Sequence, residues 1–311
     1  MEEMRFEKEL LIVKGVQWPV IEGAFKISDE TGCYGMFLVD TCSSKCILNK
    51  SMLSMLDPSF IREGETMTIS GYQGKKTTCQ AVDIFFKLQG KRELSEVFYV
   101  DEEIDFDAML DDIIGILGYE FLCKHNLVVD FSNGTLHTSD GIYPHMDDCS
   151  FLFSMEYGLE RYGVPVVGMI GNDKEFILMA DSGANVSVLT KSALEESGIE
   201  YQRGEEESCV TGFNSSFHAV AYEVNMPLLS ICSGEEHTKL VNFQDTVNVD
   251  ECNAWLLEGT TDADGNELLP VSGMLSASFM MRYKWVVDFM TGLIYSKKEE
   301  RENDRLSLLY S

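Results

Sequence analysis

The chain has 311 residues, which suggests two domains, or one large one, at about 100–200 residues per domain. It carries 24 Lys and Arg against 52 Asp and Glu, a net charge of −28, and 45% of its residues are hydrophobic. This globular composition excludes a disordered or collagen-like chain, and a polyanion of this size disfavours binding to nucleic acid or to an anionic membrane. We interpret the charge as a soluble acidic surface, with a preference for cationic peptides as the alternative.

The apolar runs are too short to cross a membrane. Runs such as 113–117 and 176–180 fall far below the roughly 20 residues that a spanning helix needs, and the run at 10–13 is too short for a signal peptide. The nine cysteines are scattered and form no CxxC pair, which is typical of reduced thiols rather than of disulfides or a zinc site. We therefore expect a cytoplasmic protein without metal or cofactor, unless a leader precedes this sequence.

In chain order, the first distinctive element is an apolar run that ends in an Asp and a small polar turn, at residues 36–43 (MFLVDTCS). The same pattern returns at residues 177–184 (ILMADSGA). Residues that favour a helix follow in both copies, at 50–56 and 191–196, and Gly198 is expected to cap the second helix.

A second repeated element is a Gly-centred turn between β-rich runs. It reads ISGYQG at 69–74 and VTGFNS at 210–215, and its Gly lies 31 residues after the Asp in both copies (71 − 40 and 212 − 181). Each turn predicts the tip of a β-hairpin.

A third and a fourth repeated element occur at a fixed spacing from each other. GILG at 115–118 precedes VVDF at 128–131, and GMLS at 273–276 precedes VVDF at 286–289, with 15 residues from the Gly to the Asp in both copies (130 − 115 and 288 − 273). Because of their apolar setting, we interpret the Asp residues of the two VVDF segments, Asp130 and Asp288, as structural strand ends.

Four ordered matches with two conserved spacings indicate a tandem duplication, roughly 8–137 and 158–296. The remaining runs are short, β-branched and aromatic, so each half is predicted to be mainly β with two short helices. We expect an N-terminal lobe at 1–140, a linker at 141–157 and a C-terminal lobe at 158–311.

The duplicated Asp turn has a specific chemical meaning. If the halves pack about a pseudo-twofold axis, Asp40 and Asp181 face each other, and two carboxylates at one site share a single proton. One carboxylate of such a pair can deprotonate a water molecule while the other protonates a substrate carbonyl. The pattern predicts peptide hydrolysis without metal or covalent intermediate.

These paired motifs resemble the aspartic proteases of the retropepsin and pepsin type, in which an Asp-Thr/Ser-Gly turn meets a later apolar-apolar-Gly segment in each half. The resemblance implies a mainly β fold of two pseudo-twofold-related, retropepsin-like β-barrel lobes with short helices, paired within one monomeric chain. It also implies a peptide or protein substrate bound in a cleft between the lobes, beneath a flap.

Carried over by position, the resemblance assigns a role to each motif residue. Asp40 and Asp181 would be the catalytic pair. The supports of the active-site loops would be Thr41, Cys42, Ser43, Ser182, Gly183 and Ala184, with the Thr41 and Ser182 hydroxyls bracing one loop against the other. The substrate-binding flaps would include Gly71, Tyr72, Gln73, Gly74, Gly212 and Phe213.

The sequence departs from the family pattern twice, because Cys42 and Ser276 stand where the family has Gly. A side chain at position 42 threatens both the close approach of the loops and the backbone N–H that faces a carboxylate. We favour an active endopeptidase. The alternatives are a non-catalytic peptide-binding protein that keeps the cleft, and halves that pair between chains.

Overall fold

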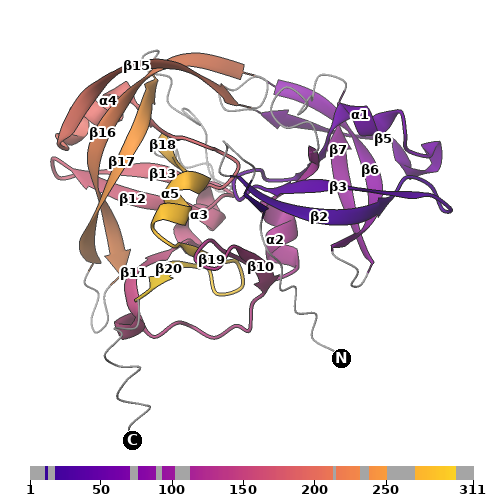
Figure 1. Cartoon of the computed structure of the whole chain (residues 1–311), viewed down its shortest axis with the longest axis horizontal. Helices are drawn as coiled ribbons and strands as arrows, with labels where there is room; N and C mark the ends of the chain where they lie inside the picture. Colours follow the sequence, from indigo (N-terminus) through magenta and orange to yellow (C-terminus); the bar gives the residue numbers. More distant parts are fainter. Residues whose placement is uncertain are drawn as a thin grey trace, which may run out of the picture.

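The two copies of the repeat fold into two β-barrels that lie next to each other in the computed structural model, the first in indigo and purple and the second in rose and orange (Figure 1). The structure describes residues 11–12, 18–70, 76–88, 93–101, 113–212, 215–231, 238–250 and 270–298. The chain is mainly β, as predicted from its short alternating runs.

The first barrel is built from the N-terminal half. Its strands are β1 (Leu11–Ile12), β2 (Pro19–Lys26), β3 (Gly32–Val39), β4 (Cys46–Leu48), β5 (Ile61–Ser70), β6 (Lys76–Leu88), β7 (Leu94–Val100) and β8 (Ile113–Leu117). They hydrogen-bond in the order β1-β2-β3-β8-β4-β7-β6-β5, and an additional pairing of β2 with β6 closes six of them into a barrel. The rings of Phe37, Phe86 and Phe98 are buried and meet in its core. The short helices α1 (Lys50–Leu53) and η1 (Pro58–Phe60) follow β4.

The second barrel repeats this topology. Its strands are β12 (Val166–Gly171), β13 (Lys174–Asp181), β14 (Ser187–Thr190), β15 (Tyr201–Gly212), β16 (Ser215–Ile231), β17 (Thr238–Asp250) and β18 (Val271–Ser276). The order is β12-β13-β18-β14-β17-β16-β15, and the pairing of β12 with β16 closes the barrel at the position where β2 meets β6 in the first. Helix α3 (Glu156–Arg161) precedes β12, and α4 (Lys191–Ser197) ends at Gly198, whose left-handed φ of 62° confirms the predicted cap.

A third sheet joins the two halves. It has the order β10 (Thr135–Thr138), β9 (Leu127–Asp130), β19 (Val286–Asp288), β20 (Leu293–Lys297) and β11 (Cys149–Ser154). Helices α2 (Tyr119–Lys124) and α5 (Ala277–Arg282) lead from the barrels into this sheet, which lies below them in Figure 1.

Two details of this sheet bear on the sequence predictions. Asp130 and Asp288 end β9 and β19 and accept backbone N–H groups of the turns that follow, which confirms their interpretation as structural strand ends. The segment predicted as a linker, 141–157, contains η2 (Met146–Asp148) and β11, so part of it is built into the sheet. Among the described residues, no helix combines the length and the apolar character needed to span a bilayer.

Candidate active site

Each Asp turn stands at the end of a barrel strand that runs parallel to the strand of the Gly motif. Asp40 follows β3, whose Val39 pairs with Leu117 of β8, and its own N–H donates to the Leu117 carbonyl at 3.1 Å. In the second barrel the same parallel pairing aligns Asp181, the last residue of β13, with Ser276 of β18. The repeated spacing between the two motifs therefore reflects a direct strand pairing at the site.

The backbone of each turn folds around its own carboxylate. Oδ1 of Asp40 accepts the N–H groups of Cys42 at 2.8 Å and Ser43 at 2.9 Å. Oδ1 of Asp181 accepts the N–H groups of Gly183 at 2.9 Å and Ala184 at 3.2 Å. The two turns thus hold their carboxyl groups in the same way, and the N–H at position 42 keeps its contact despite the side chain there.

The two turns also brace each other across the boundary between the barrels. The Thr41 N–H donates to Ser182 Oγ and the Ser182 N–H donates to Thr41 Oγ1, both at 3.0 Å. The hydroxyls in turn donate to carbonyls of the opposite half, Thr41 to Ala180 and Ser182 to Val39, the second at 2.7 Å. Both side chains are fully buried, so each of these bonds is protected from competition with water.

This brace brings the two carboxyl groups together. Asp40 and Asp181 are partly exposed, and their side chains hydrogen-bond to each other. Burial raises the pKa of Asp40, although the N–H groups of Cys42 and Ser43 oppose the shift. Burial and the negative charge of Asp40 together raise the pKa of Asp181 well above its ordinary value. The pair therefore favours a state with one shared proton.

Cys42 fits beside the pair without separating the loops. Its thiol lies 3.4 Å from the carbonyl oxygen of Ala180, and its side chain packs against an apolar cluster of the second barrel that includes Val188 and Met274. Burial, reinforced by the charges of Asp181 and Asp40, raises the pKa of the Cys42 thiol well above its ordinary value. The residue is thus a neutral apolar contact between the two halves.

Gly183 occupies the equivalent position in the second turn and has no room for a side chain. A Cβ placed there would lie 2.3 Å from Oδ2 of Asp40 and 2.5 Å from its Cγ. The motif is therefore asymmetric: the second turn needs its glycine, whereas the first turn accommodates a thiol.

The remaining predicted loop residues lie close to the pair. The Ser43 hydroxyl donates to the Lys45 carbonyl at 2.8 Å, so the contact of Ser43 with Asp40 is made by its backbone N–H and its hydroxyl stabilises the loop. Ala184 accepts the N–H of Ala277 at its carbonyl and so ties the second loop to α5.

The flap prediction falls largely on residues that the structure does not describe. Gly71, Tyr72, Gln73, Gly74 and Phe213 lie outside the described residues. Gly212 ends β15 and pairs with Ser215 of β16, which fits a hairpin with its tip at this point. In the first half, β5 and β6 pair up to Ser70 and Lys76, on either side of the other predicted tip.

Sequence reasoning overlooked three residues behind the second turn, namely Ser187, Asp245 and Arg282. Ser187 Oγ donates to Asp245 Oδ2 at 2.8 Å, and Arg282 Nη1 lies 2.9 Å from Asp245 Oδ1. A signal was present in the repeat, because these residues correspond by strand pairing and spacing to Cys46, Glu96 and Lys124.

Two carboxyl groups that share one proton offer a base and an acid at the same place. The turns, the reciprocal brace and the close pair together form a site that can polarise a carbonyl and activate water. The sequence matches no family model and no curated protein.

Proposed function

We propose that the protein is an aspartic endopeptidase that hydrolyses peptide bonds with the Asp40/Asp181 pair. The observation that carries this proposal is the hydrogen bond between the two carboxyl groups, which come from separate barrels and are held in register by the Thr41–Ser182 brace. A structural role for the pair would not explain why two acids are held together at a partly exposed position, where each raises the cost of ionising the other.

The proposed reaction begins with a single proton on the pair, which we place on Asp181. Asp40, as the carboxylate, takes a proton from a water molecule whose oxygen attacks the carbonyl carbon, while Asp181 gives its proton to the carbonyl oxygen. In the second step Asp40 donates its new proton to the leaving nitrogen and Asp181 recovers one from the gem-diol, so the C–N bond breaks and the pair returns to its starting state. No cofactor takes part.

A second candidate is a non-catalytic peptide-binding protein that keeps the cleft but not the turnover. The observation in its favour is Cys42, which adds a side chain next to the pair and packs it against the second barrel. The preserved N–H contact of Cys42 with Asp40 and the hydrogen-bonded pair favour the active enzyme.

Cleavage of a peptide library separates the two candidates. We expect the wild type to cleave peptides at acidic to neutral pH, and Asp40→Asn and Asp181→Asn each to lower kcat/KM at least 1,000-fold while the protein stays folded. Asp288→Asn is the matched control, since Asp288 also accepts two N–H groups of its own turn but lies in the third sheet, which joins the two halves. It should retain activity.

Two results would reject this assignment. Cleavage that survives in either dyad variant would show that another group does the chemistry. Binding of library peptides without cleavage by the wild type at any pH would favour the non-catalytic protein.

A further inference from the structure

The loop that carries Asp181 is fastened to the start of α5. Three of the hydrogen bonds that join them are donated by the start of α5: Ala277 N–H to the Ala184 carbonyl at 2.9 Å, Ser278 Oγ to the Asn185 carbonyl at 2.8 Å, and Ser276 N–H to Ser187 Oγ at 3.2 Å. The last of these bonds is the only one of the three in which the loop uses a side chain. It comes from the residue that pairs with Asp181 in the β13–β18 register.

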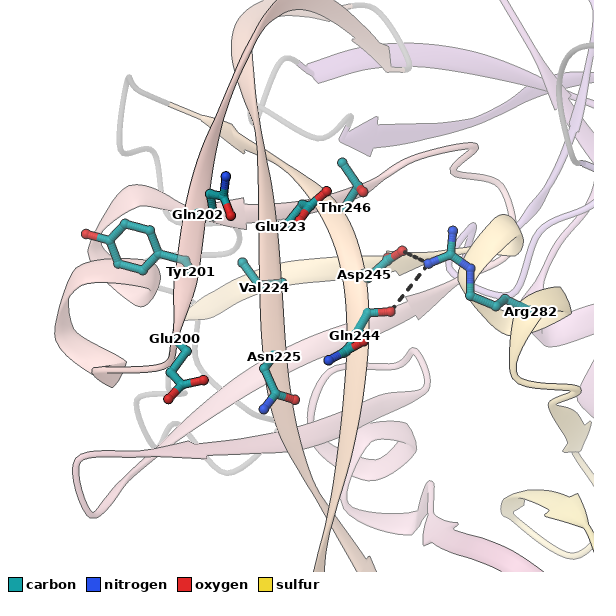
Figure 2. A pocket seen from close by; sticks show the side chains of 10 residues that line it. All are labelled: Glu200, Tyr201, Gln202, Glu223, Val224, Asn225, Gln244, Asp245, Thr246 and Arg282. Atoms are coloured by element: carbon teal, nitrogen blue, oxygen red, sulfur yellow. Dashed lines mark hydrogen bonds and ion pairs between the residues drawn. The ribbon is translucent and has the colours of Figure 1, made fainter.

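Ser187 is itself held from behind. Its hydroxyl donates to Asp245, whose side chain is only 8% exposed, and Asp245 pairs with Arg282 on α5. Figure 2 shows Asp245 and Arg282 at one side of a pocket that is lined mainly by residues of β15, β16 and β17. The volume of this pocket is about 540 Å3. Burial raises the pKa of Asp245, although Ser187 and Arg282 oppose the shift. A chain of polar contacts thus runs from the outer surface to the strand position of Asp181.

The first barrel has counterparts of these three residues with different side chains. Cys46 takes the place of Ser187 and accepts the N–H of Gly118, the counterpart of Ser276. Behind it, Glu96 pairs with Lys124 of α2 at 2.7 Å, as Asp245 pairs with Arg282 of α5. A carboxylate, a helix cation and a small polar side chain therefore recur behind both catalytic turns.

This arrangement also accounts for the second departure from the family pattern. A Cβ at Gly118 would lie 2.3 Å from the Lys45 carbonyl oxygen, so the first half requires glycine there. In the second half the Ser276 hydroxyl has room beside Ser187 Oγ, at 3.2 Å, and accepts the N–H of Phe279 at the start of α5. The serine that replaces glycine in the second half therefore hydrogen-bonds to Ser187.

We propose that Ser187, backed by Asp245 and Arg282, is a positioning residue that holds the Asp181 turn in the register needed to meet Asp40. The expected loss of activity rests on the proposed function, whereas the expected shift of the Asp181 turn does not. Without the Ser187 hydroxyl, the N–H of Ser276 and the carboxylate of Asp245 lose a buried partner, and the loop can shift relative to β18.

The kinetic test compares two replacements of the same hydroxyl. Ser187→Ala should lower kcat at least tenfold and leave KM within twofold, because the substrate site is kept while the pair is misaligned. Ser187→Cys introduces the side chain that the first half uses and should recover kcat to within about threefold of the wild type. Ser230→Ala is the matched control, since Ser230 is an equally buried hydroxyl of the same barrel that bonds to Leu152. It should lower the Tm similarly without changing kcat.

A second readout needs no activity and separates failure of this inference from failure of the proposed function. Asp181→Asn should remove the pH dependence of the free energy of unfolding that the close pair produces. We expect the change caused by Asp181→Asn to be at least halved in a protein that already carries Ser187→Ala. An undiminished effect in the Ser187→Ala background, or equal kcat in Ser187→Ala and Ser230→Ala, would overturn the positioning role. If the wild type cleaves no peptide but Ser187→Ala still diminishes the effect of Asp181→Asn on the pH dependence of unfolding, the protease assignment is overturned and the positioning role of Ser187 is kept.

Discussion

Thr41 and Ser182 exchange hydrogen bonds across the boundary between the barrels, each backbone N–H donating to the other residue's hydroxyl at 3.0 Å. The two residues are 141 positions apart in the sequence and fully buried. Because Thr41 directly follows Asp40 and Ser182 directly follows Asp181, the same bonds that join the barrels also hold the two carboxyl groups close to each other.

The first prediction concerns this brace. Thr41→Val and Ser182→Ala should each lower the free energy of unfolding by about 1–3 kcal/mol, since each leaves a buried N–H without its partner. The double variant should lose less than the sum, because breaking one side of the brace already separates the turns. Urea denaturation of the four proteins measures the coupling.

A control for this cycle is Ser230→Ala, which lies at the contact between β16 and β11. Its effect on the free energy of unfolding should add to that of Thr41→Val or Ser182→Ala. Strict additivity between Thr41→Val and Ser182→Ala would mean that the two turns move independently.

The second prediction concerns Gly183. In Gly183→Ala the new methyl group would overlap the Asp40 carboxyl, where only 2.3 Å is available, and would push it away from Asp181. We expect kcat/KM to fall more than 100-fold with a small change in Tm. Gly168→Ala is the comparison, because its Cβ would lie 2.6 Å from Oε1 of Glu175, an exposed side chain that can move aside. Comparable activity in the two variants would contradict the close packing of the pair.

The third prediction uses the raised pKa of Asp181. A carboxyl whose pKa is raised on folding keeps a proton that the unfolded chain releases, so stability declines as the pH rises above the ordinary value of 3.8. Asn at position 181 cannot ionise and can still donate to Asp40. Asp181→Asn should therefore gain stability over the wild type between about pH 4 and neutrality, measured by urea denaturation at several pH values. A constant difference across this range would refute the shift.

The fourth prediction concerns Cys42, the residue that favours the non-catalytic candidate. Cys42→Gly should keep kcat/KM within about threefold, since the N–H to Asp40 remains, and should lower the free energy of unfolding by about 1–2 kcal/mol through the lost apolar contact and the greater freedom of the unfolded chain. The raised pKa of the thiol keeps the reactive thiolate scarce, so peroxide should inactivate the wild type slowly. Mass spectrometry of peroxide-treated protein checks this, and rapid oxidation at Cys42 would contradict it.

The sequence predicted the mainly β fold and the correspondence of its halves, because the repeated motifs lie at the ends of strands that pair with each other in each barrel. Gly198 as a helix cap and Asp130 as a strand end were local patterns and were confirmed. The helix predicted at 50–56 is shorter in the structure, since α1 ends at Leu53.

Other features depend on partners that are distant in the chain. β11 lies in the predicted linker because its pairing partner is β20, more than 100 residues later, and no local pattern indicates this contact. The contacts of Ser187 could not be predicted, because they depend on Asp245 and Arg282, which look like ordinary charged surface residues in the sequence. The packing of Cys42 depends on an apolar cluster of the second barrel, which lies more than 100 residues later in the sequence.

The pH dependence of kcat/KM on a cleaved library peptide tests the shared proton most directly. Activity requires one proton on the pair, so we expect a bell-shaped profile that falls at low pH as the pair takes up a second proton and at high pH as the pair loses its last one. Because burial and the charge of Asp40 raise the pKa of Asp181 well above its ordinary value, the alkaline limb should lie above the range of ordinary carboxyl groups. A profile with a single limb, or no cleavage at any pH, would contradict the account.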